Sequence, residues 1–124
     1  MAKILIVDDD VVNSQLLVNK LSGSGHSVIH ATDGDAARLN FSSKFDVILL
    51  DIMMPKVDGV TLLSELKKGV NKSTPVLIYT NLFVEETKKK CAELGASEVL
   101  LKADFTPQGI VDKIESYLES VNSK

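Results

Sequence analysis

The sequence predicts an α/β fold, a doubly wound parallel sheet of five strands with a helix after each strand, or (βα)₅. Two observations lead to this prediction. Five short hydrophobic runs, rich in β-branched residues, recur along the chain without the apolar–polar alternation of a half-exposed strand. Between them lie stretches of helical composition, each about long enough to cross from one parallel strand to the next. We therefore expect helices on both faces of the sheet.

Each predicted strand is a short run dominated by valine, isoleucine and leucine, which suit a sheet that is buried on both faces. In chain order the predicted strands are Ile4–Val7, Val28–Ala31, Val47–Leu50, Val76–Tyr79 and Val99–Leu101. Pro75 stands at the start of the fourth run, where its missing amide does little harm.

The predicted helices are bounded by residues that suit helix ends. In chain order they are Val11–Leu21, Asp35–Phe41, Val60–Lys68, Glu85–Leu94 and Pro107–Val121. Four of them follow a residue whose side-chain oxygen can accept hydrogen bonds from the first free amides, namely Asp10, Asp33, Asp58 and Thr106. Three glycines suit the far ends of helices, namely Gly23, Gly69 and Gly95. Pro107 suits a first helical turn.

Length and composition limit the possible functions. The chain has 124 residues, 44% of them hydrophobic, so we expect a single domain over residues 1–124. Its 14 basic and 17 acidic residues give a net charge of −3, which argues against direct binding to nucleic acid. The single cysteine, Cys91, allows no internal disulfide. We see neither a signal peptide nor an apolar run of ~18 residues, so we expect a cytoplasmic protein without membrane insertion.

Polar residues follow the predicted strands, at the edge where ligands bind in doubly wound sheets. These residues are Asp8, Asp9 and Asp10 after the first strand, Asp51 after the third, Thr80 after the fourth and Lys102 after the fifth. If the first and third strands are neighbours, Asp8 or Asp9 lies within about 5 Å of Asp51, at a cost of roughly 3 kcal/mol. A cation must therefore balance these carboxylates, and both Lys102 and Mg²⁺ suit this purpose.

Taken singly, most of these residues have simpler explanations. Asp10 is interpreted as a helix cap, Thr80 is an ordinary strand residue, and Lys102 equally suits a solvated strand end. Asp51 follows four apolar residues, and burying a carboxylate there without a purpose is expensive. Together, a carboxylate nucleophile, a cation, a hydroxyl and an amine are the groups that phosphoryl transfer requires.

Four motifs in order resemble the response-regulator receiver domains, also called CheY-like. They are ILIVDDD (Ile4–Asp10), VILLDIMMPKVDG (Val47–Gly59), PVLIYTN (Pro75–Asn81) and GASEVLLKA (Gly95–Ala103). The resemblance covers essentially the whole chain. It implies a flavodoxin-like sheet with the strand order 2-1-3-4-5, and a role in a two-component or phosphorelay signalling pathway.

The resemblance also implies roles for individual residues at a magnesium site. Asp51 and Asp9 would bind Mg²⁺ directly, Asp8 would bind it through water, and the backbone carbonyl of Met53 would complete the protein ligands. The metal would neutralise charge and hold the reactants in place, rather than generate hydroxide.

The phosphoryl group itself would be carried by Asp51, which the resemblance identifies as the phosphoacceptor. The donor would be a phosphohistidine on a sensor histidine kinase or a histidine phosphotransfer protein. Thr80 would hydrogen-bond the phosphoryl oxygen, and Lys102 would pair with that oxygen or with Asp51. We expect a downstream target protein or effector domain as the second partner, and a monomer or weak dimer.

The sequence departs from the family pattern at two positions. Ala103 stands where the family often has a proline joined by a cis peptide, and we expect a trans peptide because a cis bond before alanine costs ~2.5 to 4 kcal/mol. Val99 stands where the family often has an aromatic residue that couples to the threonine. A signal through that aromatic residue is therefore not expected here.

Several remaining residues are interpreted as structural. His26 and His30 flank the second predicted strand, and we expect surface or edge positions for them, far from the carboxylates. Cys91 is expected to be a small buried residue, and Lys88 to Lys90 to form a solvated helix face.

Two other functions fit parts of the sequence. A Mg²⁺-dependent phosphatase with an aspartyl nucleophile would need a carboxylate two residues after Asp51, where Met53 stands, so we expect no turnover enzyme. A phosphorylation-independent interaction module would be expected to lack an acidic ligand, the acceptor or the lysine, and none is missing. The resemblance also implies that Met53 and Leu82 border the path of water to a phosphorylated Asp51. Neither side chain can act as a general base or hold an attacking water, so we expect slow self-dephosphorylation.

Overall fold

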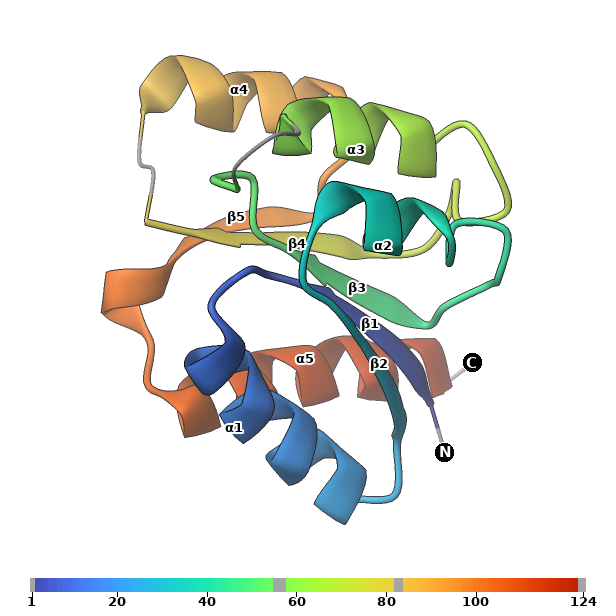
Figure 1. Ribbon diagram of the computed structural model, residues 1–124, viewed down its shortest axis with the longest axis vertical. Helices are drawn as coiled ribbons and strands as arrows, with labels where there is room; N and C mark the ends of the chain where they lie inside the picture. The colour runs from blue at the N-terminus through green and yellow to red at the C-terminus, as the bar shows by residue number, and fades with distance from the viewer. Residues whose placement is uncertain (1, 55–57, 82–83, 123–124) are drawn as a thin grey trace.

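A computed structural model of the chain describes residues 2–54, 58–81 and 84–122, and it confirms the alternation of strands and helices (Figure 1). In chain order the elements are β1 (Lys3–Val7), α1 (Val11–Gly23), β2 (Ser27–Ala31), α2 (Gly34–Arg38), β3 (Val47–Leu50), α3 (Gly59–Leu66), β4 (Val76–Thr80), α4 (Glu85–Glu93), β5 (Glu98–Leu101) and α5 (Pro107–Asn122). A short 3₁₀ helix, η1 (Lys102–Asp104), follows β5 directly.

The five strands form one parallel sheet in the order β2-β1-β3-β4-β5, which confirms the predicted topology. Helices α1 and α5 cover one face of the sheet, and α2, α3 and α4 cover the other (Figure 1). In the register, Val7 is opposite Leu50 and Thr80 is opposite Leu101. The carboxyl ends of the strands therefore meet at one rim.

Alternate residues of the central strands pack into two separate apolar layers. Leu5, Ile48 and Ile78 belong to the layer under α2, α3 and α4, whereas Ile6 and Leu49 belong to the layer under α1 and α5. All of these side chains are buried. Burial on both faces explains why the strands read as continuous hydrophobic runs in the sequence.

The four predicted capping residues occupy the positions expected of them. In chain order, Asp10 accepts a hydrogen bond from the amide of Asn13, Asp33 from Ala36, Asp58 from Val60 and Thr106 from Gly109. These bonds satisfy amides that have no partner within the helix. The glycine prediction holds for Gly95, which follows the C-cap of α4 with a φ of 103°. It is less accurate after α1, where Gly23 is the last helical residue and Gly25 has the positive φ, 92°. Gly69 follows α3 by three residues, within a turn.

Helix α2 ends three residues earlier than predicted, at Arg38. The side-chain amide of Asn40 donates to the carbonyl of Ala36, which a continuing helix would use for the backbone amide of Asn40. That backbone amide donates to Ala37 instead. Within the part of the chain that the structure describes, none of the helices combines the length and apolar character needed to cross a bilayer.

Candidate functional site

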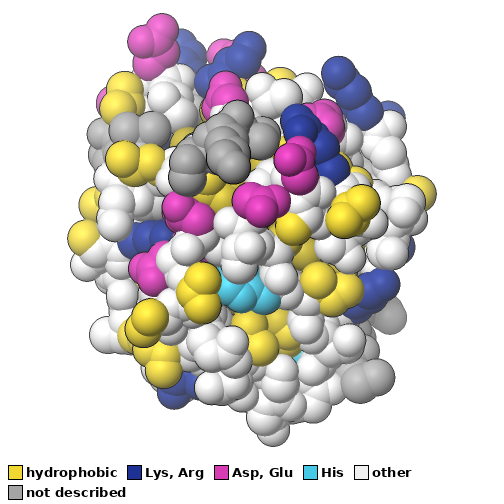
Figure 2. Space-filling model, viewed as in Figure 1, with side chains coloured by type: hydrophobic (Ala, Val, Ile, Leu, Met, Phe, Trp, Pro, Cys, Tyr) yellow, Lys and Arg dark blue, Asp and Glu magenta, His cyan; other side chains and the backbone are white. Residues whose placement is uncertain are grey.

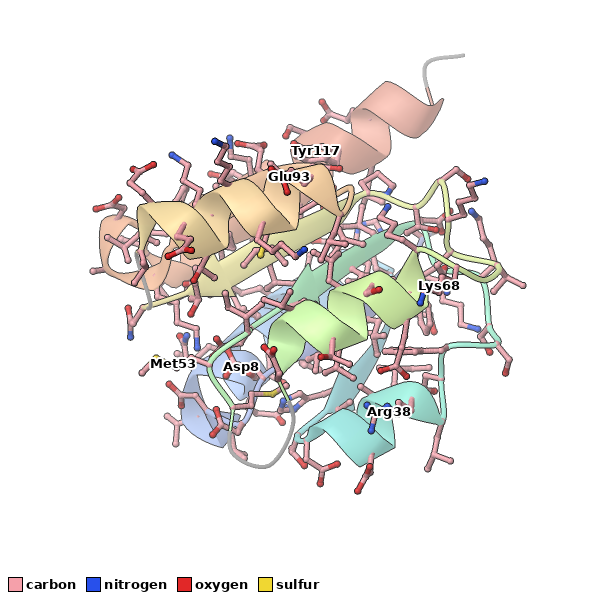
Figure 3. The ribbon with its side chains drawn as sticks, turned by 90° about the horizontal axis from the view of Figure 1, so that it is seen from above. Asp8, Arg38, Met53, Lys68, Glu93 and Tyr117 are labelled. Carbon is pink, nitrogen blue, oxygen red and sulfur yellow. The ribbon has the colours of Figure 1, made fainter. Side chains whose placement is uncertain are left out.

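The acidic residues lie at the carboxyl ends of two adjacent strands. Asp8 follows β1, and its amide donates to the carbonyl of Ala31 at 3.0 Å; Asp51 follows β3, and its amide donates to the carbonyl of Val7 at 2.9 Å. These bonds continue the sheet by one residue and fix the two carboxylates beside each other. Figure 3 shows Asp8 and Met53 at this end of the sheet, and Figure 2 shows acidic side chains gathered on one face of the molecule.

Asp8, Asp9 and Asp51 form a cluster in which one carboxylate oxygen of each lies within 4.8 Å of the others. Asp8 and Asp51 are 2% and 4% exposed, whereas Asp9 is open to solvent. Asp8 Oδ1 accepts a hydrogen bond from the amide of Asp10, and Asp51 Oδ1 accepts one from the amide of Met53, both at 2.9 Å. The loop after each strand thus orients the carboxylate that precedes it.

Lys102 brings a positive charge to the two buried carboxylates. Its Nζ lies 2.7 Å from Oδ2 of Asp8 and 2.9 Å from Oδ2 of Asp51. The lysine is the first residue of η1, and its peptide bond to Ala103 is trans, as predicted. The carboxylates and the ammonium that the sequence singled out on separate strands therefore meet in one ion-pair network.

Burial and ion pairing act in opposite directions on the protonation of these groups. Burial raises the pKa of Asp8 above its usual value, and the hydrogen bond from Lys102 opposes this rise. For Lys102, burial lowers the pKa, but hydrogen bonds to Asp8 and Asp51 outweigh it, so the pKa is raised. The ammonium therefore stays charged across the physiological range.

Thr80 is fully buried at the carboxyl end of β4, on the same rim. Met53 presents an exposed side chain, and its amide contacts Asp51. The predicted ligand role of the Met53 carbonyl stays a prediction. Leu82 lies outside the described residues.

Two residues near this rim were missed by the sequence reasoning. Nε2 of His30 lies 3.0 Å from the carbonyl oxygen of Asp8, so the expectation that both histidines lie far from the carboxylates is wrong for His30. The register places His30 opposite Ile6, two residues before Asp8, and its long side chain spans this offset. The ring of Tyr79 lies beneath Lys102, with Nζ 5.6 Å from the ring centroid. The sequence held one indication of this role, since Tyr79 directly precedes Thr80 at the end of a predicted strand.

The other residues to which the sequence analysis gave structural roles lie where those roles place them. His26 lies at the opposite end of β2 from the site, where it pairs with Glu115 at 2.7 Å and accepts a hydrogen bond from the amide of Ala2. Cys91 is fully buried. Lys88, Lys89 and Lys90 lie on the exposed face of α4. Val99 is half-buried and packs against the apolar layer under α3 and α4.

Comparison with known proteins finds relatives among transcriptional regulators. The chain is 35% identical over 121 residues to the probable transcriptional regulator ycf27 of Guillardia theta, covering 97% of this chain and 46% of that protein. It is 37% identical over 118 residues to the transcriptional regulatory protein CpxR of Klebsiella pneumoniae, covering 95% of this chain and 50% of that protein. The chain thus spans about half the length of these curated relatives.

A solved structure and a family model both match this chain to receiver domains of response regulators. The receiver domain of the Francisella response regulator 1452 superposes with a TM-score of 0.83 at 30% identity, over 98% of this chain and 99% of that one. The model of the response regulator receiver domain matches residues 4–115. This match covers β1 to most of α5, including all the clustered residues at the rim. The chain therefore belongs to the response regulator receiver domain family.

Proposed function

We propose that this receiver domain accepts a phosphoryl group on Asp51 in a Mg²⁺-dependent reaction. The donor is a phosphohistidine on a sensor histidine kinase or a histidine phosphotransfer protein, and the recipient of the signal is a target protein or effector domain. The observation that carries this proposal is the contact of Lys102 with both buried carboxylates, in a cluster that Asp9 completes.

In the proposed reaction, a carboxylate oxygen of Asp51 attacks the phosphorus atom of the donor. An oxygen–phosphorus bond forms, the nitrogen–phosphorus bond breaks, and the histidine ring leaves. Lys102 stands 2.9 Å from Asp51 Oδ2, where its charge can stabilise the oxygens of the transferred group. The buried hydroxyl of Thr80 is the proposed hydrogen-bond donor to one of those oxygens.

The carboxylate cluster fits a hard divalent cation, which prefers oxygen ligands and keeps several waters. Asp9 and Asp51 are the proposed direct ligands, with Asp8 acting through water and Met53 through its carbonyl. When bound, Mg²⁺ would neutralise the charge that collects around the phosphoryl group. Asp9 is the most exposed of the three carboxylates, so it is open to an incoming hydrated ion.

The domain is proposed to hold its phosphoryl group rather than turn over substrate. The side chain two residues after Asp51 is Met53, which can neither donate nor accept a proton in the reaction. The phosphorylated state then lasts until water reaches it. We further propose a cytoplasmic location, as a monomer or weak dimer, for a domain of this kind.

Mass spectrometry tests the proposed function directly. The protein is incubated with Mg²⁺ and acetyl phosphate, and the wild type should gain the mass of one phosphoryl group. Asp51→Asn should gain none, and omission of Mg²⁺ should suppress the gain in the wild type. A phosphoryl group on Asp51→Asn, or none on the wild type with Mg²⁺, would refute the assignment.

A further inference from the structure

Tyr79 is a buried aromatic residue that stands directly before Thr80 on β4. It is 3% exposed and belongs to the apolar layer under α1 and α5. Ile78, the residue before it, packs into the opposite layer. Because side chains alternate along a strand, Tyr79 and Thr80 project to opposite faces of the sheet. An aromatic ring thus lies beside the site on the face away from Val99, which packs against the layer that contains Ile78.

The strand register places this ring next to Lys102. Tyr79 is opposite Leu100, and both belong to the layer under α1 and α5. Lys102 follows Leu100 by two residues, so its side chain leaves the end of β5 on that same face. Its Nζ lies over the ring, 5.6 Å from the centroid, within the range of a cation–π interaction.

The hydroxyl of Tyr79 is held from the other side by α1. Burial is the main reason that the pKa of Tyr79 is raised, and the interaction of its hydroxyl with the side chain of Asn13 opposes this rise. Asn13 is half-buried and also donates its backbone amide to Asp10. The ring is therefore fixed between the start of α1 and the lysine.

We propose that Tyr79 is a positioning residue for Lys102. A lysine side chain is long and flexible, and a single fixed location for its ammonium requires packing that removes the alternative rotamers. The ring supplies one wall for this side chain, so that Nζ reaches Asp8 and Asp51 together. The consequence for phosphoryl transfer rests on the proposed function of the domain.

NMR of the Lys102 side chain tests its placement over the Tyr79 ring, and this test needs no phosphorylation. Protons that lie over an aromatic ring are shifted upfield by its ring current, so the ε-methylene of Lys102 should be shifted in the wild type. Tyr79→Phe keeps the ring and should keep the shift, whereas Tyr79→Leu should lose it. Tyr117→Leu is the matched control, because it removes the only other tyrosine, on α5, and should leave the shift unchanged.

The same four proteins are then compared for their rate of phosphorylation by acetyl phosphate with Mg²⁺. Tyr79→Leu should lower the maximal rate between about 2-fold and 30-fold, the equivalent of a cation–π energy of ~0.5 to 2 kcal/mol at ~1.36 kcal/mol per tenfold. The concentration of acetyl phosphate that gives half the maximal rate should change little, because Tyr79 does not contact the donor. Tyr79→Phe should restore the rate.

An unshifted ε-methylene in the wild type would overturn the proposal even if Tyr79→Leu failed to fold. A wild-type rate in folded Tyr79→Leu would also overturn it. If the wild type shows the shift but takes up no phosphoryl group, the proposed function fails, while the positioning of Lys102 by Tyr79 is supported.

Discussion

The ammonium nitrogen of Lys102 lies 2.7 Å from Oδ2 of Asp8, closer than the 2.9 Å that separates it from Oδ2 of Asp51. Asp8 follows β1 and Lys102 follows β5, and the sheet order places β3 and β4 between these strands. The lysine therefore reaches across the rim and pairs with both buried carboxylates at once. In the absence of a metal ion, it is their main source of positive charge.

Lys102→Ala should destabilise the metal-free fold by about 3 kcal/mol, because removing one partner leaves two buried carboxylates without a counter-charge. Mg²⁺ should recover part of this loss, since a bound cation replaces the ammonium. Urea denaturation with and without Mg²⁺ measures both effects. Lys89→Ala, on the exposed face of α4, is the control. A variant that phosphorylates normally and still engages its target would contradict the role of Lys102.

Asp9→Asn should abolish Mg²⁺ binding and slightly stabilise the metal-free protein. Asp9 is exposed, so solvent weakens its repulsion with Asp8 and Asp51. The gain in the free energy of unfolding should therefore stay below ~1 kcal/mol. Metal titration and chemical denaturation report the two effects. Asp10→Asn keeps the helix cap and removes an adjacent charge, so it should bind Mg²⁺ with nearly wild-type affinity. Near-normal affinity of Asp9→Asn for Mg²⁺ would contradict the assignment of Asp9 as a metal ligand.

Gly59→Ala should destabilise the fold by about 3 kcal/mol, at the upper end of ordinary overpacking costs. A Cβ at Gly59, the first residue of α3, would lie 2.2 Å from the Cα of Ile52, just after Asp51. Gly23→Ala is the matched control, because a Cβ there meets nothing within 4 Å, and its effect should be neutral or stabilising by up to ~1 kcal/mol. Equal stabilities for the two variants in thermal unfolding would show that the loop adjusts freely.

Tyr117 should titrate far above an ordinary tyrosine. Burial raises its pKa to about 12, assisted by the hydrogen bond and negative charge of Glu98. Because the folded-state pKa is raised, the protonated phenol stabilises the fold below its ordinary pKa of 10.0, and this contribution is lost as the pH rises through about 12. Phenolate absorbance in a Tyr79→Phe background, where Tyr117 is the only tyrosine, measures this titration.

Glu98→Gln should shift that titration towards lower pH, because it removes the negative charge beside the phenol. Glu115→Gln is the control, since Glu115 pairs with His26 instead. An unshifted titration in Glu98→Gln would show that burial alone sets the pKa of Tyr117.

Met53→Asn should accelerate loss of the phosphoryl group by about tenfold, the rate equivalent of one hydrogen bond worth ~1.4 kcal/mol to an attacking water. Met53 is exposed beside Asp51 and cannot hold a water. Phosphate release is compared with Val70→Asn, a similarly exposed position after α3. Leu82→Ala extends the test to the other predicted border of the water path. Unchanged or slower phosphate release in both Met53→Asn and Leu82→Ala would show that shielding from water by these side chains does not set the lifetime of phosphorylated Asp51.

The sequence predicted the layers and the site for a common physical reason. Strands buried on both faces read as uninterrupted apolar runs, and the residue that ends each run must lie at the ligand-binding edge of a parallel sheet. Asp51 and Lys102 were found in this way. The contacts of His30 and Tyr79 were not, because they depend on which strands are neighbours and on which face each side chain leaves. The early end of α2 depends on one side-chain hydrogen bond of Asn40, which no periodicity reveals.

The separation of Asp8 and Lys102 along the chain affects how the protein is made. A ribosome releases β1 and β3 before β5, so Asp8 and Asp51 emerge before the ammonium that balances them. A nascent chain that stops after β4 can bury these carboxylates only if they take up protons or bind a cation from solution. Lys102 can thus balance these two carboxylates only after β5 has been synthesised.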